Sequence, residues 1–520
     1  MSSVAHPRSL TLLALAVLGA GCRRPSPATA TAPSEDPVVA TASGPVRGRT
    51  LEGGVRAFLG VPYAAPPTGG RRFRAPEPPA PWTTPRDASR VGPACPQLRP
   101  PPYATTSEDC LTVNVWSPSG PAGKPVLLFL PGGAFVEGSG GYQLYDGARL
   151  AARVDAVVIT MNYRVGPLGF MGHPDLAREA GLHATPSFGL LDQQAALAWV
   201  RKNVHRFGGN PEAVTLFGQS AGAFSACAHL VMPDSRGLFQ RAVLQSGACS
   251  GPLWIGPREA EVQGEKLAAA LGCQDLACLR AAPVEQVLSA LPLKKRYLLP
   301  PGVWWGPVVD GETLPFVPRE ALRRGMGAPI PLIVGWNRDE GTAHTFGAAT
   351  VSDEDRDSFV RDSWGSAAVQ PIAERYARPT TKASLTDIVT DGAFACEARR
   401  LARAHAARGN AVYAYELTHT LDAPAFHPLG ATHNVELFLL FGNEEAGIRL
   451  SAAELPFSAL VMDAWGRFAR HSDPNGPTTS WPRYDDAKDR LLLLDLPLAT
   501  ASGVKRADCD FWDGIARTLE

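Results

Sequence analysis

The chain has 520 residues, of which 45% are hydrophobic and 19% are charged. This composition supports a sizeable hydrophobic core and excludes a chain that is disordered throughout. Lysine plus arginine equals aspartate plus glutamate, at 50 each, so the formal charge is zero and gives no reason to expect nucleic acid as a partner. Nothing in these numbers predicts an oligomeric state.

The N-terminus has the features of an export signal. Arg8 precedes the apolar run SLTLLALAVL at 9–18, and small residues then precede Cys22. A run of this length is typical of a signal peptide and is short for a membrane span. Two interpretations stay open: residues 1–21 are an ordinary signal peptide, or they are a lipoprotein signal that leaves a lipid on Cys22. We therefore expect an exported protein, either secreted or a lipoprotein of the periplasm or cell envelope.

Residues 22–37 are rich in Pro, Ala, Ser and Thr and are predicted to form a flexible linker. No convincing linker follows, which favours a single domain over 38–520.

Short apolar runs alternate with helical patterns in this domain. A helix is indicated by Leu191, Ala195 and Trp199 on one stripe, ended by GGNP at 208–211. Near-continuous apolar strands that alternate with helices predict an α/β fold with a central, mostly parallel sheet flanked by helices. The candidate strands are 126–130 (VLLFL), 156–161 (AVVITM), 214–217 (VTLF), 241–245 (RAVLQ), 330–334 (IPLIV) and 412–416 (VYAYE).

A glycine turn then offers an oxyanion site. LPGGAF at 130–135 directly follows the first candidate strand. Backbone N–H groups on such a loop, together with that of the residue after a nucleophile, can stabilise the negative oxygen of a tetrahedral intermediate. This predicts an oxyanion hole formed by the N–H groups of Gly133, Ala134 and Ala221, where Ala221 is the residue after Ser220, the candidate nucleophile of the next motif. The alternative is a plain glycine turn.

The segment GQSAG at 218–222 fits the pattern G-x-S-x-G, which alone is common enough to arise by chance. Its context makes it specific, because a strand precedes it and a plausible helix, Ala221–Leu230, follows. A serine on such a turn adopts strained backbone angles and lies at the positive end of the helix dipole. Ser220 is therefore predicted to be a nucleophile; the alternative is a glycine-rich turn with an incidental serine.

Further motifs extend the pattern over most of the chain. They are FLGVPY at 58–63, SEDCL at 107–111, NVW at 114–116, NYRVG at 162–166, GLLDQ at 189–193, FGGNP at 207–211 and LQSG at 244–247. With these motifs, residues 38–520 resemble the type-B carboxylesterase/lipase family, which includes carboxylesterases, cholinesterases and bacterial nitrobenzyl-type esterases. The resemblance implies an α/β-hydrolase fold with large insertions and a catalytic domain that uses no cofactor and no metal.

The resemblance also assigns a catalytic acid. The family pattern G-x-N-x-D-E-G appears as GWNRDEG at 335–341, after the fifth candidate strand. The acid of this pattern corresponds to Glu340, whereas its neighbour Asp339 corresponds to a structural residue. By the same resemblance, Ser246 is expected to support the acid from behind.

The family's histidine pattern appears as GATHNVEL at 430–437, which places the catalytic base at His433 and leaves His427 out of register. The resulting order of Ser220, Glu340 and His433 is the one expected of this fold. The imidazole is needed because a serine hydroxyl is a poor nucleophile at neutral pH, and the carboxylate fixes its tautomer.

The resemblance pairs six of the nine cysteines. The implied disulfides are Cys95–Cys110, Cys273–Cys278 and Cys396–Cys509. Cys227 and Cys249 then either form a fourth bridge or stay as small buried residues, and Cys22 is left as the lipid acceptor. The resemblance also implies two structural ion pairs, Arg72–Glu108 and Arg164–Asp192.

Two departures from the family bear on the substrate. Gln219 replaces the glutamate that usually precedes the nucleophile, and the loop from Cys95 to Cys110 is short and contains no tryptophan. In cholinesterases a longer loop carries the aromatic residue that binds quaternary ammonium groups, so we expect choline esters to be poor substrates. We expect a mostly apolar pocket, although core packing is the alternative for each aromatic residue; its predicted lining is Phe135, Gln219, Trp254, Val303, Trp304 and Trp305.

The sequence therefore predicts a serine carboxylesterase that hydrolyses small neutral esters through an acyl-enzyme. Two alternatives remain. A lipase acting on long-chain acylglycerols would need a larger lid and an exposed apolar entrance. A non-catalytic adhesion or binding relative would lack a working triad.

Overall fold

The computed structural model describes residues 36–249, 253–294 and 302–517. The predicted signal at 1–21, the lipid-acceptor candidate Cys22 and all but the end of the linker at 22–37 lie outside these ranges. Contacts within the chain define one unit over Pro37–Glu520, which nearly coincides with the predicted domain.

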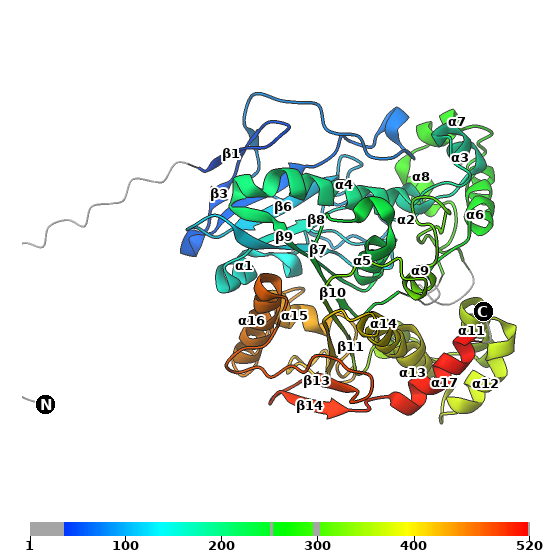
Figure 1. Ribbon diagram of the computed structural model, residues 1–520. Helices are drawn as coiled ribbons and strands as arrows, with labels where there is room; N and C mark the ends of the chain where they lie inside the picture. Colours follow the sequence, from blue (N-terminus) through cyan, green and yellow to red (C-terminus); the bar gives the residue numbers. More distant parts are fainter. Residues whose placement is uncertain (1–35, 250–252, 295–301, 518–520) are drawn as a thin grey trace, which may run out of the picture. The chain divides into compact units, whose positions relative to one another are not determined.

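Two sheets organise this unit (Figure 1). The strands are β1 (Val38–Ala40), β2 (Pro45–Arg47), β3 (Arg49–Thr50), β4 (Arg56–Pro62), β5 (Arg86–Asp87), β6 (Thr112–Ser117), β7 (Lys124–Leu130), β8 (Val157–Met161), β9 (Gly209–Gln219), β10 (Arg241–Gln245), β11 (Leu332–Asn337), β12 (Val412–Leu417), β13 (Arg490–Leu494) and β14 (Ala499–Ser502). The large sheet has eleven strands in the order β14-β13-β12-β11-β10-β9-β7-β8-β6-β4-β3, and the small sheet has the order β1-β2-β5.

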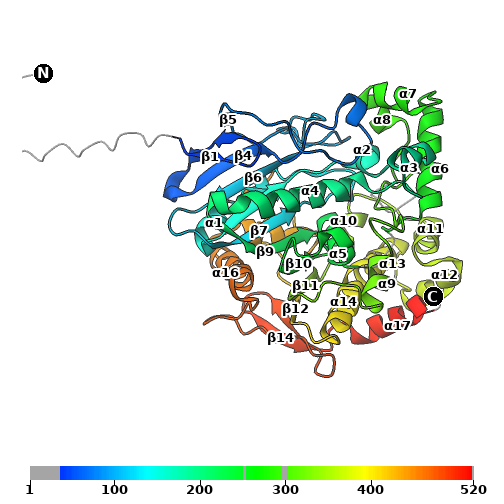
Figure 2. The ribbon, with the colours of Figure 1, turned by 45° about the horizontal axis from the view of Figure 1, so that its top comes forward.

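The middle of the large sheet, from β13 to β8, is parallel, and antiparallel pairs close both edges. Figure 2 shows the sheet running from β14 to β4 across the unit. This confirms the predicted α/β fold with a mostly parallel sheet, and all six predicted strands are present. Strand β11 begins two residues later than predicted because Pro331 has no N–H to donate, and Leu332 makes the first bond, to Ala411 O.

Helices cover both faces of the sheet. They are α1 (Ala148–Val154), α2 (Gly166–Phe170), α3 (Pro174–Ala180), α4 (Phe188–Asn203), α5 (Ala221–Val231), α6 (Pro257–Ala270), α7 (Leu276–Ala281), α8 (Val284–Ser289), α9 (Pro318–Arg323), α10 (Gly341–Thr345), α11 (Asp353–Trp364), α12 (Val369–Arg375), α13 (Thr381–Ile388), α14 (Cys396–Ala406), α15 (Val435–Phe441), α16 (Leu455–His471) and α17 (Arg506–Arg517). Helices α4, α5 and α14 pack on strands of one face, and α1 and α16 on the other.

Strand β7 shows how the sheet separates two cores. Its seven residues are all buried. Val126, Leu128 and Leu130 pack into the core beneath α5, while Leu127 and Phe129 pack into the core beneath α16. Alternate side chains of a strand point to opposite faces, so the stretch Val126–Leu130, covered on both sides, is apolar throughout, and the buried Lys124 at the start of β7 is paired with Asp155.

Helix α4 differs from its prediction in two respects. It ends at Asn203, and a 3₁₀ turn over Val204–Phe207 leads to Gly208 in the left-handed conformation. Its most buried side includes Asp192 and Gln193, whereas the predicted stripe residues Leu191 and Ala195 are only partly buried. Polar side chains can be buried there because each has a charged or hydrogen-bonding partner on the core side.

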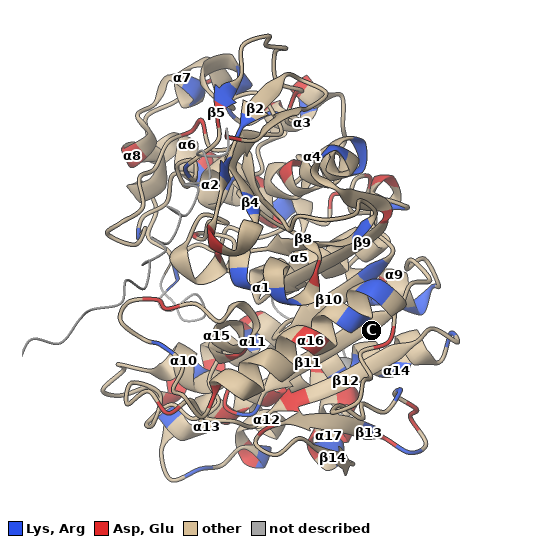
Figure 3. Ribbon diagram, turned by 90° about the vertical axis from the view of Figure 1, so that its left-hand side faces the viewer, with Lys and Arg blue, Asp and Glu red and all other residues tan. Residues whose placement is uncertain are grey.

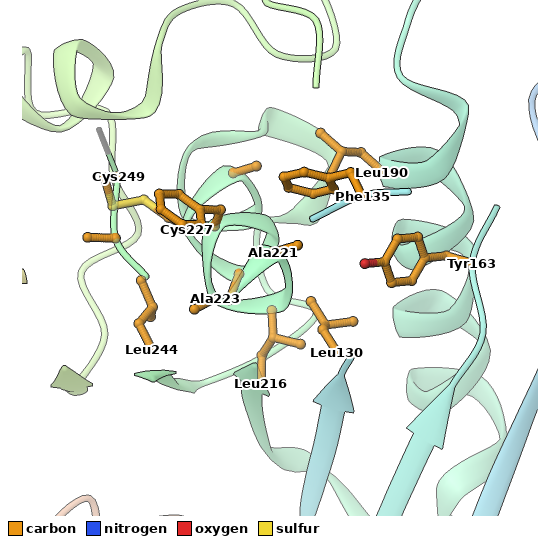
Figure 4. Close-up of a cluster of buried hydrophobic side chains, with 14 of the residues drawn as sticks. Leu130, Phe135, Tyr163, Leu190, Leu216, Ala221, Ala223, Cys227, Leu244 and Cys249 are labelled. Atoms are coloured by element: carbon orange, nitrogen blue, oxygen red, sulfur yellow. A yellow bond between two sulfur atoms is a disulfide. The ribbon is translucent and has the colours of Figure 1, made fainter. Parts of the chain in front are cut away.

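Four disulfides cross-link the unit, namely Cys95–Cys110, Cys227–Cys249, Cys273–Cys278 and Cys396–Cys509. The three bridges implied by the resemblance are confirmed, and the open alternative for Cys227 and Cys249 is resolved in favour of a fourth bridge. Figure 4 shows this bridge joining α5 to the segment after β10, inside the core cluster.

The two ion pairs implied by the resemblance, Arg72–Glu108 and Arg164–Asp192, are also formed, and each arginine makes two hydrogen bonds to its carboxylate.

Basic and acidic residues are intermixed over the ribbon, without a large region of one sign (Figure 3). Within the described ranges, none of the helices is both long and apolar enough to cross a membrane.

Candidate active site

The nucleophile candidate lies on a sharp turn between β9 and α5. Ser220 has φ 54° and ψ −124°, a conformation that a non-glycine residue adopts only under strain. The turn is tight because a Cβ on Gly218 would lie 2.3 Å from Gly222 O, and a Cβ on Gly222 would lie 1.9 Å from Leu130 O. The two glycines therefore let the strand, the helix and the end of β7 touch, as the G-x-S-x-G pattern predicts.

The predicted oxyanion loop packs against this turn. A Cβ on Gly132 would lie 2.8 Å from Gln219 O and 3.1 Å from the Cβ of Ser220. The loop then reverses, with φ 118° at Gly133 and φ 53° at Ala134. No described residue accepts a hydrogen bond from either of these two N–H groups.

Ala221 supplies the third predicted donor. As the first residue of α5, its N–H has no acceptor within the helix. The three predicted oxyanion donors thus lie on the two segments that meet at Ser220.

The acid candidate is buried and held at both oxygens. Glu340 follows β11 and is 0% exposed. One oxygen accepts a 2.7 Å hydrogen bond from the backbone N–H of Asn337, and the other lies 2.5 Å from Nδ1 of His433. A carboxylate in this position fixes the tautomer of the imidazole and leaves Nε2 as the proton acceptor.

The loops that carry these two residues are joined by their backbones. Asp339 N donates to Ala431 O, and Ala431 N donates to the side chain of Asp339 at 2.8 Å. Asn337 Nδ2 donates to Thr432 O at 2.8 Å. The loop after β11 therefore fixes the position of the histidine loop, and Asp339 holds loops together instead of contacting His433.

His427, the other histidine near the predicted base in the sequence, does not contact Glu340. His427 is exposed, and its Nε2 lies 3.0 Å from Asp422 O. The structure thus brings Glu340 to His433, as the resemblance implies, and leaves His427 apart.

Gln219 contacts the imidazole directly. Its Nε2 lies 3.2 Å from Nε2 of His433, so the amide donates to the nitrogen that would receive the serine proton. No hydrogen bond within the described ranges joins Ser220 Oγ to His433. Catalytic hydrogen bonds are often long in the absence of substrate, so this arrangement is compatible with a triad.

A second carboxyl group lies behind the acid. Glu436, in α15, is buried and accepts a 2.6 Å hydrogen bond from Asn337 Nδ2. Burial, and then repulsion from Glu340, raise the pKa of Glu436 from 4.5 to about 7. The sequence pattern does not single out Glu436, because its raised pKa depends on burial that no local pattern reveals.

Ser246 is buried behind the site with φ 50°, and its N–H donates to Gly335 O at 2.9 Å. Its Oγ has no hydrogen-bond partner among the described residues, and the expected support of Glu340 from behind stays a prediction.

The predicted pocket residues are mainly buried in the core beneath α5. Phe135 and Trp305 are at most 1% exposed, and Phe135 packs edge-on against Phe170. Trp304 is also buried, and Trp254 and Val303 pack against the same core. Except for Gln219, a lining role for these residues stays a prediction.

Two aromatic side chains that sequence analysis missed lie against the base. The ring of His344 lies 5.2 Å from that of His433, and Phe394 lies 4.9 Å from it. His344 follows Glu340 by four residues, so helical spacing could have indicated that it shares a face with the acid. Phe394 carries no such signal, because it reaches the site from the distant π-helical segment Val389–Ala395.

No group of three or more potential metal ligands is present within the described ranges.

Comparison with known proteins agrees with this geometry. The model of the carboxylesterase family matches residues 35–512. The para-nitrobenzyl esterase of Bacillus subtilis (strain 168) is 36% identical, with 88% of this chain and 94% of that protein covered. The acetylcholinesterase of Bungarus fasciatus is 34% identical, with 91% of this chain and 86% of that protein covered.

Solved structures give the same result. A PNB esterase superposes with a TM-score of 0.82 at 34% identity, covering 91% of this chain and 99% of the other. A second, described as a thermophylic PNB esterase, gives a TM-score of 0.81 at 32% identity, covering 91% and 99%. The fold is therefore that of the α/β-hydrolases, and the chain belongs to the carboxylesterase family, as a carboxylic-ester hydrolase.

Proposed function

We propose that this carboxylesterase hydrolyses neutral esters through an acyl-enzyme on Ser220, with His433 as general base and acid and Glu340 as its partner. The observation that carries this proposal is the buried 2.5 Å contact between Glu340 and His433, because Nε2 of the same imidazole lies 3.2 Å from Gln219, the residue before the strained Ser220.

The first half-reaction forms the acyl-enzyme. His433 Nε2 takes the proton of Ser220 Oγ while Oγ bonds to the ester carbon, and the carbonyl oxygen becomes negative. The N–H groups of Gly133, Ala134 and Ala221 stabilise that oxygen. His433 then returns the proton to the leaving alcohol as the carbon–oxygen bond breaks.

The second half-reaction repeats these steps with water. His433 takes a proton from water, the hydroxide oxygen bonds to the acyl carbon, and Ser220 leaves with the proton. Gln219 must release Nε2 of His433 for either half-reaction, because its amide donates to that nitrogen in the resting structure.

A neutral substrate is supported by the charge of the site. Gln219 contributes no negative charge beside Ser220, whereas a quaternary ammonium group would gain most from an anion and a tryptophan face. The segment from Cys95 to Cys110 contains no tryptophan, and its Tyr103 hydroxyl is already bonded to Glu445. We therefore expect acetylcholine to be hydrolysed far more slowly than an uncharged isostere such as 3,3-dimethylbutyl acetate.

A fluorophosphonate probe tests the nucleophile. We expect the wild type to be labelled and Ser220→Ala to remain unlabelled. Ser225 on the same helix provides a matched control, because its Oγ accepts a hydrogen bond from Gln193 and faces the core. Equal labelling of Ser220→Ala and Ser225→Ala would contradict the assignment, and an unlabelled wild type would favour a non-catalytic binding relative.

Soluble and emulsified substrates separate an esterase from a lipase. We expect rates on acyl esters to fall as the acyl chain lengthens, without a rise when the substrate forms droplets. Activation at the droplet surface would favour the lipase alternative.

We also propose that the protein is exported and carries a lipid on Cys22. The chain has nine cysteines, and eight of them are paired in the four disulfides, which leaves Cys22 for another role. Disulfide formation is typical of oxidising compartments outside the cytosol. Detergent partitioning of the wild type and of Cys22→Ser tests this, since only the wild type should enter the detergent phase. Entry of both into the aqueous phase would favour a secreted protein.

A further inference from the structure

Beside the proposed base lies a second histidine that the reaction does not use. His344 is in α10, and its ring packs 5.2 Å from His433 and 5.6 Å from Phe394, almost parallel to the latter at 18°. Phe394 in turn packs on His433 at 4.9 Å. The three rings form one cluster, in which His344 and Phe394 both pack against the imidazole that moves the protons.

The nitrogen Nε2 of His344 is buried and has no hydrogen-bond partner among the described residues. Each of the other buried histidines within the described ranges makes at least one hydrogen bond, although His405 also leaves one nitrogen, Nδ1, without a partner while its Nε2 lies 2.7 Å from Ile330 O. His229 uses both nitrogens, at 2.8 Å to Ser235 Oγ and 3.0 Å to Gln193 Oε1. Leaving a buried polar atom without a partner is destabilising, so an unpartnered nitrogen next to a reactive group suggests that a ligand supplies the partner.

His344 offers this nitrogen without a charge. Burial, and then the neighbouring His433, lower the pKa of His344 to about 3. The ring is therefore neutral at neutral pH, and each nitrogen either donates or accepts a hydrogen bond according to the tautomer. A neutral ring also avoids repelling the imidazolium that forms on His433 during each half-reaction.

We infer that His344 is a specificity-determining residue that hydrogen-bonds an uncharged oxygen of the substrate, so that the preferred esters carry a hydroxyl, ether or keto oxygen near the ester group. This inference rests on the proposed triad, because it places the substrate against His433. The ring of Phe394 packs nearly parallel to that of His344 and helps to hold it in position.

Two pairs of near-isosteric esters test this inference, one for each side of the ester bond. On the acyl side, ethyl 3-hydroxybutanoate is compared with ethyl 3-methylbutanoate. On the alcohol side, 2-methoxyethyl acetate is compared with butyl acetate. The measured quantity is the ratio of kcat/KM for the oxygen-bearing ester to that for its apolar partner.

We expect His344→Phe, which keeps an aromatic ring beside Phe394, to lower this ratio about 10- to 100-fold in at least one pair, because the substrate oxygen loses its partner. His344→Gln should recover much of the ratio, since its amide can hydrogen-bond from a similar distance. His427→Phe is the matched control, because His427 is exposed and bonded to Asp422 O; its ratio should equal that of the wild type.

Different experimental results would contradict the role of His344 and the role of the triad. Unchanged ratios for His344→Phe in both pairs would overturn the role of His344, whatever the absolute rates. Hydrolysis of the apolar esters by Ser220→Ala at the wild-type rate would overturn the triad without reference to any ratio. If His344→Phe does not fold, the ratios of His344→Leu and His344→Gln give the same comparison.

Discussion

The two halves of the proposed site are built in different ways. The nucleophile half, formed by the turn at Ser220 and the loop at Gly132–Ala134, is shaped by backbone contacts so close that a single Cβ would disrupt them. The acid–base half, formed by Glu340 and His433, is held by hydrogen bonds between buried side chains and loops 93 residues apart. The first half therefore depends mainly on steric fit, and the second mainly on charge and hydrogen bonding. Substitutions that change one property at a time can separate these two kinds of dependence.

The largest loss of activity is expected from a substitution of the catalytic acid, Glu340. Glu340→Gln keeps the shape but removes the negative charge opposite His433, so kcat should fall on the order of 1,000- to 10,000-fold. Asp339→Asn is the matched control, because Asp339 contacts Arg338 and Ala431 N but not His433. It should lower kcat less than tenfold. Steady-state kinetics on one soluble ester measure both, and the opposite ranking would reassign the acid.

A smaller effect should come from the oxyanion loop. The added methyl of Gly132→Ala would press on Gln219 O and Ser220 Cβ and displace the donors, so kcat should fall about 100- to 1,000-fold. Gly70→Ala is the matched control, since no atom lies within 4 Å of its added Cβ. KM should change little in either variant. An unchanged kcat in Gly132→Ala would show that this loop is not part of the oxyanion site.

The disulfide Cys227–Cys249, which anchors helix α5, can be tested through the free energy of unfolding. Removing Cys227–Cys249 by a double alanine substitution should lower the free energy of unfolding by about 3 kcal/mol, against about 2 kcal/mol for Cys273–Cys278, because the closed loops differ in length. The sequence separations are 22 and 5 residues. Both members of the first bridge are also buried, so a small cavity adds to its loss. Denaturant unfolding of both variants provides the comparison, and a larger loss for Cys273–Cys278 would contradict it.

The smallest expected effect is on the pH dependence of the free energy of unfolding, and it concerns Glu436 in the acid–base half. Its pKa is raised from 4.5 to about 7 in the folded chain, so the folded state holds a proton that the unfolded state releases. This contribution to stability is complete below pH 4.5 and is lost as the pH rises towards 7. It should amount to about 2 kcal/mol between pH 5.5 and 7, since one pKa unit corresponds to about 1.4 kcal/mol.

Glu436→Gln should remove this slope while keeping the bond to Asn337, because an amide oxygen can still accept it. The measurement is the free energy of unfolding against pH for wild type and variant. Parallel curves would mean that another group dominates the titration.

The same contrast between the two halves explains what the sequence could predict. Ser220 and the glycine loop can be predicted because their conformations need particular residues at fixed local spacing beside strands with near-continuous apolar runs. Glu340 and His433 required the resemblance to a family, since local patterns alone do not separate them from Asp339 and His427.

Other features depend on partners far along the chain. The pKa of Glu436 is raised because the fold buries its carboxyl group and places it near that of Glu340, and Phe394 reaches His433 only because a π-helical segment brings it there. In α4, the helical pattern pointed to Leu191 and Ala195, whereas Asp192 is buried by its pair with Arg164. Hydrophobic periodicity cannot detect a polar residue whose partner lies in another element.

The strained backbone of Ser220 makes reactivity a property of the folded chain alone. A residue with φ 54° is held there by the contacts of Gly218, Gly222 and Leu130, and its base arrives from 213 positions further on, at His433. An unfolded chain has neither the angle nor the base, so its serine is as inert as any other. Covalent labelling of Ser220 should consequently count native molecules, and its loss during heating would report unfolding directly in crude extracts, without purification.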